Sequence, residues 1–297
     1  MTPVRMHADE VHTDVSTVGR LVAAQLPHWA HLAVEPVASS GTDNAMYRLG
    51  DELVVRLPRI PSAVDAVARE LRWAPRLAPH LPVPVPVPVA SGRPGEGYPF
   101  PWSVLPWLPG RNPLAGEVTR ADRLARDLAG FVRELRRTDP TDGPPAGRGV
   151  PLAARDDDTR AAVAALDGVV DTDAVTAVWA DALRPAARPA SVAWCHGDLS
   201  PGNVLVHEDG TLAAVIDLAG VGVGDPTVDL SVAWNLLPAD ARPVFRDALG
   251  VDEATWLRGR AWALSIALIQ LPYYRETNPA LAANSRHVIA EVLAEAG

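Results

Sequence analysis

The sequence contains no lysine, and all 27 of its basic residues are arginines. A site that ordinarily uses a lysine must therefore use an arginine here or do without that cation. The only cysteine, Cys195, excludes an intrachain disulfide, which fits a reducing compartment. No apolar run is long enough to cross a bilayer, and the first 20 residues lack the apolar stretch of a signal peptide. We expect a cytoplasmic protein with no membrane partner.

The sequence has fewer basic than acidic residues. Basic residues number 27 and acidic residues 36, which gives a net charge of −9. Nucleic-acid binding needs a clustered positive surface, so we expect no nucleic-acid partner, whereas a cationic ligand is compatible. The 297 residues, 48% of them hydrophobic, leave room for two lobes. The oligomeric state, monomer or dimer, stays open.

The first third of the chain has the pattern of a small sheet with helices. Helical apolar spacing covers residues 12–30 and 62–74, and Pro75 should end or kink the second helix. Alternating prolines at 81–89 cannot donate to a sheet ladder, so this stretch must be an extended connector or an edge strand. Strands are expected at 33–37, 45–49, 52–57 and within 98–108.

Beyond Pro109 the pattern becomes mainly helical. Thr119 and Asp122 resemble a capping box at the start of a helix. Further helices are expected at 155–168, at 172–186 and over most of the chain from 229, with a β-hairpin at 203–207 and 211–217. A β-rich front followed by helices indicates an α+β protein of two domains, 1–108 and 109–297.

A loop rich in glycine and proline, HGDLSPGN at 196–203, lies between two short apolar runs. Phosphoryl transfer needs a positioned hydroxyl, metal ions across the phosphates and positive charge. For that chemistry, Asp198 would accept or orient the proton of the acceptor hydroxyl, and Asn203 would reach a metal. Asp217, at the end of the apolar run VID, offers a hard oxygen ligand for Mg²⁺. Taken singly, Asp198 is also typical of a turn and Asp217 of a strand-end cap, but the three together indicate a phosphoryl-transfer site.

These motifs resemble those of the aminoglycoside phosphotransferase family, antibiotic kinases with the protein-kinase fold whose near relatives are macrolide phosphotransferases. HGDLSPGN, VIDL (215–218) and GDPTVDL (224–230) stand where the family has its catalytic loop, metal-binding aspartate and GDP…DLA segment, and the likeness extends over roughly residues 35–240. The resemblance implies a bilobal kinase-like fold. Its N-terminal nucleotide-binding lobe has a small antiparallel sheet with one main helix, and its larger C-terminal lobe is mostly helical and binds the acceptor. It also implies ATP or GTP with Mg²⁺.

The resemblance further implies supporting roles. Asp229 would brace the catalytic loop through hydrogen bonds, and His196 would pack and bond the backbone rather than act as a base. Arg56 stands in the strand that usually presents a phosphate-binding lysine, and Glu70 in the helix that carries its partner carboxylate. We therefore expect an Arg56–Glu70 ion pair. Cys195 is expected to be buried and inert.

Two segments of the N-terminal lobe resemble nucleotide-binding elements of this family. SSGTDN (39–44), which includes Ser40, resembles the loop that folds over the phosphates, although it is equally typical of a hairpin turn. LPWL (105–108) resembles the interlobe hinge. There the carbonyl of Pro106 and the N–H of Leu108 would pair with the edge of adenine.

The acceptor is the part of the function that the sequence specifies least. An aminoglycoside, which carries several ammonium groups and needs several carboxylates, is the expected acceptor. The candidate carboxylates are Asp156, Asp157, Asp158 and Glu276. The aspartate triplet equally fits a helix N-terminus, where the helix dipole favours acidic residues. A macrolide, a metabolic sugar or amino alcohol, and a catalytically silent nucleotide-binding protein on the same fold remain alternatives.

Overall fold

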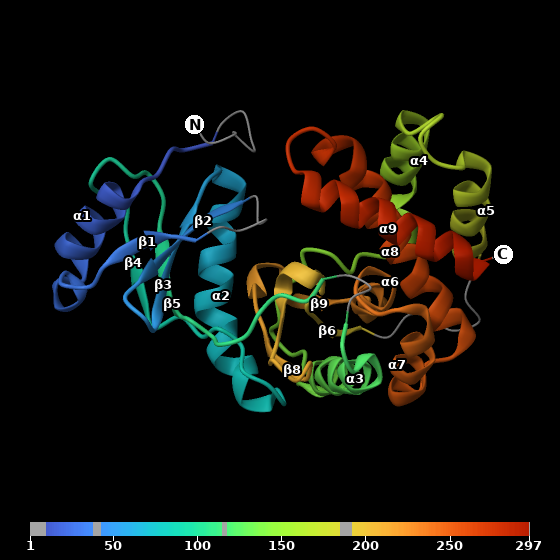
Figure 1. Cartoon of the computed structure of the whole chain (residues 1–297), viewed down its shortest axis with the longest axis horizontal. Coiled ribbons are helices and arrows are strands. Elements are labelled where there is room, and N and C mark those ends of the chain that lie inside the picture. Colours follow the sequence, from blue (N-terminus) through green and yellow to red (C-terminus); the bar gives the residue numbers. More distant parts are fainter. Residues whose placement is uncertain (1–9, 38–42, 115–117, 185–191, 297) are drawn as a thin grey trace. The chain divides into compact units, whose positions relative to one another are not determined.

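The computed structural model describes residues 10–37, 43–114, 118–184 and 192–296, and its contacts divide the chain into two compact units (Figure 1). The first comprises Met1–Pro79, Pro84–Pro109 and Ile216–Ala219, and the second comprises His80–Val83, Gly110–Val215 and Gly220–Gly297. The change of unit after Pro109 lies next to the expected boundary at 108. The segment Ile216–Ala219, which belongs to the first unit although it lies late in the sequence, contains the candidate site residue Asp217.

The first unit is built on one antiparallel sheet of five strands in the order β1-β2-β3-β5-β4. The strands are β1 Val34–Pro36, β2 Asn44–Leu49, β3 Leu53–Pro58, β4 Ala90–Gly92 and β5 Trp102–Pro106. The turn between β2 and β3 contains Gly50 with φ 60°, a conformation that glycine adopts without strain. The strands predicted at 33–37, 45–49 and 52–57 are confirmed to within a residue, and the one predicted within 98–108 is β5.

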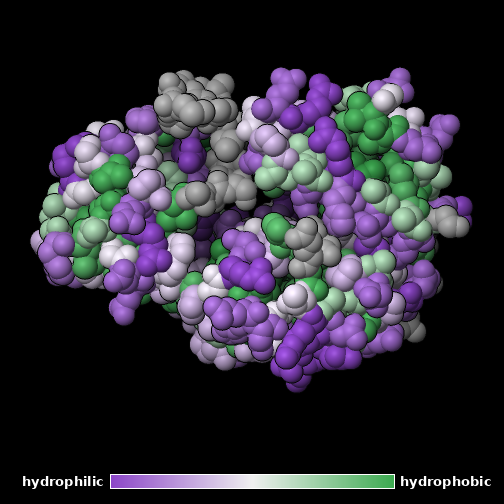
Figure 2. Space-filling model, viewed as in Figure 1, coloured by the Kyte–Doolittle hydropathy of each residue, from purple (hydrophilic) through white to green (hydrophobic). Residues whose placement is uncertain are grey.

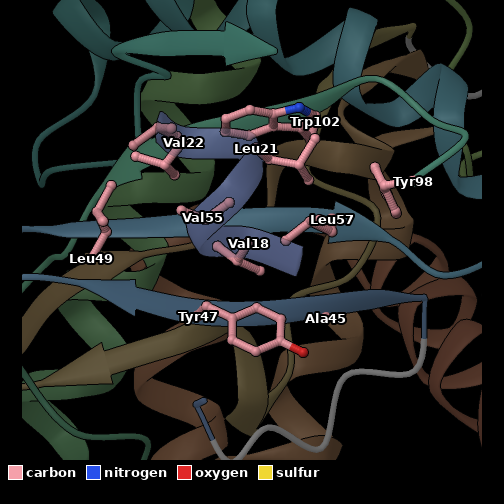
Figure 3. Packing of buried hydrophobic residues seen from close by; sticks show 11 residues of the cluster. Val18, Leu21, Val22, Ala45, Tyr47, Leu49, Val55, Leu57, Tyr98 and Trp102 are labelled. Carbon is pink, nitrogen blue, oxygen red and sulfur yellow. The ribbon is translucent and has the colours of Figure 1, made fainter. Parts of the chain in front are cut away.

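Two helices, α1 (Val15–Gln25) and α2 (Val64–Leu77), cover opposite faces of this sheet. Because side chains alternate across a strand, Val55 of β3 packs with Trp102 and the apolar face of α1 (Figure 3). Its neighbour Arg56 points to the other face, where it meets Glu70 of α2. Both faces of β3 are therefore covered, and this strand holds a charged side chain inside the unit.

The structure corrects two local predictions and decides a third. Pro75 does not end its helix, since α2 continues to Leu77 with the proline in its last turn, where few backbone bonds are lost. The capping box expected at Thr119 is wrong. The N-cap of α3 (Ala121–Arg137) is Arg120, with φ 56°, and its side chain makes no capping bond. The segment 81–89 belongs to no strand and connects to the edge strand β4, which was not predicted.

The second unit is mostly helical, with two small sheets that pair β6 with β9 and β7 with β8. Its strands are β6 Ala193–Cys195, β7 Val204–Val206, β8 Leu212–Val215 and β9 Gly222–Gly224. Besides α3, its helices are α4 Asp156–Ala165, α5 Thr172–Ala182, α6 Val232–Asn235, α7 Arg242–Leu249, α8 Glu253–Tyr274 and α9 Pro279–Ala296. One buried cluster includes Trp179, Cys195 and Trp262, which come from α5, β6 and α8. The predicted α+β class is confirmed, although the helices predicted at 155–168 and 172–186 end several residues earlier.

Hydrophilic side chains cover much of the face shown in Figure 2, and apolar residues lie in smaller patches between them. Large apolar side chains that are exposed, such as Val89, Leu114 and Val169, belong to different segments of the chain. None of the helices among the described residues combines the length and the apolar character that crossing a bilayer requires.

Candidate active site

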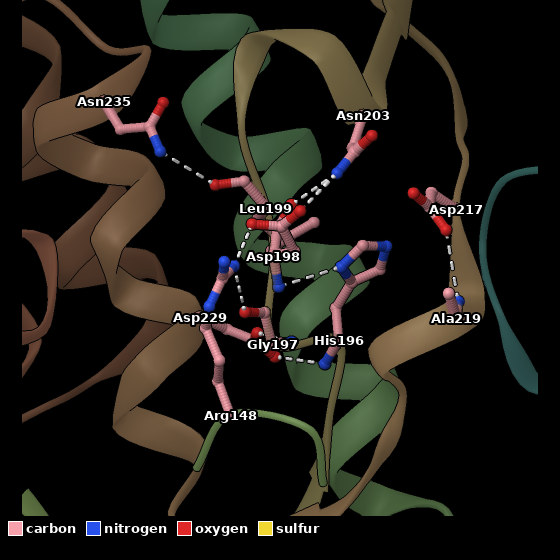
Figure 4. A network of polar contacts seen from close by, with 10 residues as sticks. All are labelled: Arg148, His196, Gly197, Asp198, Leu199, Asn203, Asp217, Ala219, Asp229 and Asn235. Atoms are coloured by element: carbon pink, nitrogen blue, oxygen red, sulfur yellow. Dashed lines mark hydrogen bonds and ion pairs between the residues drawn. The ribbon is translucent and has the colours of Figure 1, made fainter. Parts of the chain in front are cut away.

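The loop HGDLSPGN (196–203) follows β6 and enters β7 through a 3₁₀ turn, Pro201–Asn203. The buried carboxylate of Asp229 accepts the N–H of Gly197 at 2.8 Å and that of His196 at 2.9 Å (Figure 4). Burial raises the pKa of Asp229, while His196 and these two N–H groups oppose the shift. The ring of His196 is also buried, and its Nδ1 accepts the N–H of Asp198 at 3.2 Å. The backbone that carries Asp198 is therefore fixed by groups inside the unit.

The carboxylate of Asp198 is held at both of its oxygens. Asn203 Nδ2 donates to Oδ2 at 3.0 Å and to the main-chain carbonyl of Asp198 at 2.9 Å. Arg148 Nη1 donates to the other oxygen, Oδ1 (Figure 4). Because the amide nitrogen of Asn203 faces Asp198, the amide oxygen points the other way, which is the orientation that a metal ligand needs.

In the first unit, a cluster of charges surrounds Arg56. The side chain is almost fully buried and pairs with Glu70 at 2.9 Å and with Asp217 at 3.0 Å. In the amide orientation that satisfies both groups, the Asn44 oxygen also accepts from Arg56 Nη2 at 2.9 Å. Burial opposes the positive charge, yet Glu70 and Asp217 hold the pKa of Arg56 above its ordinary value. Arg56 is therefore a permanent cation whose direction is set by three neighbours.

Asp217 lies two residues beyond β8 in a left-handed conformation, with φ 65°. Its Oδ1 accepts the N–H of Ala219 at 3.3 Å (Figure 4). Residues other than glycine adopt this conformation at a cost, and such positions gather at functional sites. The side chain is 40% exposed, so a ligand can reach it while Arg56 holds it from the protein side.

Asn203 in the second unit offers an amide oxygen and Asp217 in the first unit offers a carboxylate, both hard donors of the kind that Mg²⁺ prefers. In the part of the chain that the structure describes, no group of three or more histidine, cysteine, aspartate or glutamate side chains could hold a metal ion by itself. Mg²⁺ commonly binds through one or two protein oxygens together with substrate phosphates and water. Each of the two residues, taken by itself, therefore fits the chemistry of a magnesium ligand.

Main-chain groups near the end of β5 bond to neighbours on both sides of this strand. The N–H of Trp107 donates to the carbonyl of Glu52 at 2.7 Å, whereas the carbonyl of Val104 accepts from the opposite edge at 2.8 Å. Polar groups of successive residues in an extended chain point to alternate edges. By this alternation the carbonyl of Pro106, the last residue of β5, is directed away from β3, and Leu108 lies two residues beyond the strand. Ser40, the predicted phosphate-loop residue, lies outside the described residues.

A family model described as the phosphotransferase enzyme family matches residues 34–262, well over half of the chain. The chain belongs to the phosphotransferase enzyme family. The resemblance stated from its motifs is thereby confirmed. None of the curated proteins compared with the chain matches it.

Solved structures of antibiotic kinases share the fold of this phosphotransferase-family chain. The GDP complex of wild-type aminoglycoside 2′-phosphotransferase IIIa gives a TM-score of 0.75 at 18% identity, covering 96% of this chain and 100% of that one. The GDP and kanamycin complex of APH(2″)-IIIa gives 0.72 at 20% identity, with coverage of 94% and 98%. Macrolide 2′-phosphotransferase MphH from Brachybacterium faecium gives 0.63 at 22% identity, with coverage of 94% and 97%. The predicted kinase-like fold is confirmed.

The carboxylates predicted to bind the acceptor lie at two helix ends of the second unit, the start of α4 and the residues after α8. They are Asp156, Asp157 and Asp158 in the first turn of α4, and Glu276 beyond α8. Asp156 Oδ1 accepts from Trp179 Nε1 at 2.7 Å and from Arg160 Nε at 2.8 Å, so it is engaged within the unit. The side chain of Glu276 is 85% exposed. The first turn of a helix favours acidic residues by itself, so the triplet has a structural explanation as well.

Three residues that the sequence analysis did not single out also hold the catalytic loop. They are Asn112, Arg148 and Asn235. Asn112 Nδ2 donates to the carbonyl of Gly202 at 2.9 Å, and Asn235 Nδ2 donates to the carbonyl of Leu199 at 3.2 Å. All three are distant from the loop along the chain, and no local pattern links them to it. The glycines that flank Arg148 are the one available signal, because they indicate a close approach of the backbone.

Proposed function

We propose that this protein transfers the γ-phosphoryl group of ATP or GTP to a hydroxyl group of an aminoglycoside antibiotic. The observation that carries the proposal is the carboxylate of Asp198, held at both oxygens on a loop whose backbone is fixed by Asp229. Phosphoryl transfer depends on positioning and on charge stabilisation far more than on covalent help from the protein. A carboxylate with a single orientation suits the task of aligning an acceptor hydroxyl.

Each charged group then has a defined task. Asp198 orients the acceptor hydroxyl and takes up its proton as the hydroxyl oxygen bonds to the γ-phosphorus, while the bond from that phosphorus to the β,γ-bridging oxygen breaks and ADP or GDP leaves. Asn203 and Asp217 would each supply an oxygen ligand to Mg²⁺, which would neutralise charge on the phosphates. Arg56, directed by Glu70, binds the phosphates in place of the usual lysine, and its planar fork can contact two oxygens at once.

The remaining contacts with the nucleotide come from the first unit. The carbonyl of Pro106 and the N–H of Leu108 pair with the base, and the segment containing Ser40 covers the phosphates. We infer that the protein works in the cytoplasm, which supplies ATP and GTP, and where a lone buried thiol such as that of Cys195 stays reduced.

The choice of an aminoglycoside rests on exposed carboxylates and on a structural neighbour. Asp157, Asp158 and Glu276 are exposed acidic side chains of the second unit, as a polycationic acceptor requires. The solved kanamycin complex shares the fold over 94% of this chain.

A macrolide is the second candidate, because of one pocket in the second unit. The pocket includes Asn235, Ile266, Ala267 and Val288 and has no acidic side chain in its lining. Asn235 also bonds the catalytic loop at Leu199, so the pocket adjoins that loop. The lining is uncharged and mixes apolar side chains with amides and hydroxyls, which suits a macrolide better than a polycation.

The test is phosphate transfer by the purified protein with Mg²⁺ and either ATP or GTP. The acceptors are aminoglycosides, macrolides, small sugars and amino alcohols, and the Asp217→Asn variant serves as the blank. Transfer to aminoglycosides that is lost in the blank is the expected result. Transfer to macrolides alone would establish the second candidate. Nucleotide binding without transfer to any acceptor would contradict the proposal and favour a catalytically silent nucleotide-binding protein.

A further inference from the structure

The cation beside Asp198 comes from a segment far from the catalytic loop in sequence. The loop at 196–203 contains no arginine, and the chain contains no lysine. Arg148, fifty residues upstream, places Nη1 against Asp198 Oδ1 and also donates to the carbonyl of Gly197 at 3.3 Å. One guanidinium therefore contacts both the side chain of Asp198 and the peptide that precedes it.

The backbone on both sides of Arg148 is anchored. The N–H of Gly147 donates to the carbonyl of Gly220 at 3.0 Å, and the carbonyl of Gly149 accepts a main-chain N–H at 2.6 Å. Gly149 has φ 109°, and a Cβ at this position would lie only 3.1 Å from Cys195 Sγ. Glycine is therefore required where the segment packs against β6, and Arg148 extends from a backbone with little freedom to shift.

The ion pair between Arg148 and Asp198 is partly exposed to water. The side chains of Arg148 and Asp198 are 31% and 42% exposed. Ion pairs with this much contact with water add little to the stability of a fold, because solvent screens them. The anchored segment that presents Arg148 therefore calls for a role other than stabilising the unit.

We propose that Arg148 is a positioning residue that holds Asp198 in the orientation needed to align the acceptor hydroxyl. Asn203 restrains Oδ2 and Arg148 restrains Oδ1, so rotation of the carboxylate is blocked from both sides. With only one restraint, the carboxylate can turn away from the acceptor. This inference rests on the proposed function, since it concerns the same phosphoryl transfer.

The kinetic test compares Arg148→Met, which keeps an unbranched stem but lacks the guanidinium and its donors, with Arg148→Lys. We expect Arg148→Met to lower kcat about 10- to 100-fold, the range typical for loss of a group that orients another, with the KM for nucleotide nearly unchanged. Arg148→Lys should recover part of the loss, because it restores a charged donor. The matched control is Arg123→Ala, which removes an exposed ion pair with Asp127 at 2.9 Å on α3 and should leave kcat unchanged.

Thermal unfolding separates positioning from a structural role. Arg148→Met should unfold at the temperature of the wild type, since the lost pair is exposed. A kcat within about twofold of the wild type would overturn the proposal. A loss of activity that is matched by a large fall in the unfolding temperature would overturn it as well, because it would assign Arg148 to the fold.

A crystal structure of Arg148→Met supplies a readout that does not depend on transfer. We expect the Asp198 carboxylate to occupy more than one rotamer in this variant, and a single unchanged orientation would refute the inference. If the wild-type protein transfers phosphate to no acceptor, the proposed function fails. The crystal structure then still decides whether Arg148 orients Asp198.

Discussion

The Glu70→Leu variant tests how much the buried Arg56–Glu70 ion pair contributes to the stability of the first unit. Glu70 is fully buried and Arg56 is 3% exposed, so Glu70→Leu would leave a cation inside the unit with part of its compensation lost. Loss of one partner of a buried pair costs about 3–5 kcal/mol. Because Arg56 keeps Asp217 at 3.0 Å, we expect the lower end, about 3 kcal/mol of unfolding free energy.

The double variant Arg56→Met/Glu70→Leu should recover most of that loss. Buried ion pairs can often be replaced by apolar side chains of similar volume at little cost, and Asp217, which loses its partner, is 40% exposed to water. Phosphate transfer should nevertheless stay abolished, because the cation that binds the phosphates is gone. The double variant would then be nearly as stable as the wild type but would not transfer phosphate.

The assay is hydrogen exchange of the β3 amides under increasing denaturant, which reports on the first unit by itself. Arg20→Ala is the control, since its pair with Glu96 at 3.6 Å is exposed and its loss should cost no more than about 0.5 kcal/mol. A cost below about 1 kcal/mol for Glu70→Leu would refute the reasoning. A double variant that is as unstable as the single one would refute it too.

Three further predictions concern the second unit. Asp229→Asn should lower the unfolding free energy by about 1–3 kcal/mol in a urea titration. The two N–H groups of the loop bond different carboxylate oxygens, and the variant replaces one of these oxygens by an NH₂ group that cannot accept, so an unchanged titration would contradict this. Asn203→Ala should raise the Mg²⁺ concentration that gives half-maximal transfer, while nucleotide binding measured without metal should not change. If the variant and the wild type depend on Mg²⁺ in the same way, Asn203 is not a metal ligand. Cys195 should resist thiol reagents in the native protein and react after unfolding, because burial raises the pKa of its thiol. Rapid labelling of the native protein would contradict the burial of this thiol.

Part of the candidate site could be predicted from short motifs and from the predicted secondary structure. Asp198 and Asn203 lie five residues apart in one loop, so the bond between them follows from a single short motif. Arg56 and Glu70 are 14 residues apart, on a strand and a helix that sequence patterns predict, and their pairing was expected from the family resemblance. In both cases the contact depends on elements that the sequence describes directly.

Other parts of the fold and the candidate site depend on contacts between segments that are distant in the sequence, which local patterns do not predict. Arg148 meets Asp198 only because its segment packs beside β6 and β9, where Gly222 leaves no room for a Cβ. The start of α3 follows from the left-handed Arg120 and not from the capping motif at Thr119. The acceptor site stays a proposal for the same reason, because acidic side chains at a helix start serve the helix as well as a ligand.

The most direct measurement is kcat for phosphate transfer by Asp198→Ala, with Mg²⁺, nucleotide and acceptor all saturating. The account predicts a fall of roughly 10²- to 10⁴-fold, the contribution typical of a positioned group that accepts a proton in the transition state. Nucleotide binding should remain, because the residues assigned to it, Arg56 and Glu70, are unchanged. A variant that turns over as fast as the wild type would contradict the assignment of Asp198 and, with it, the proposed active site.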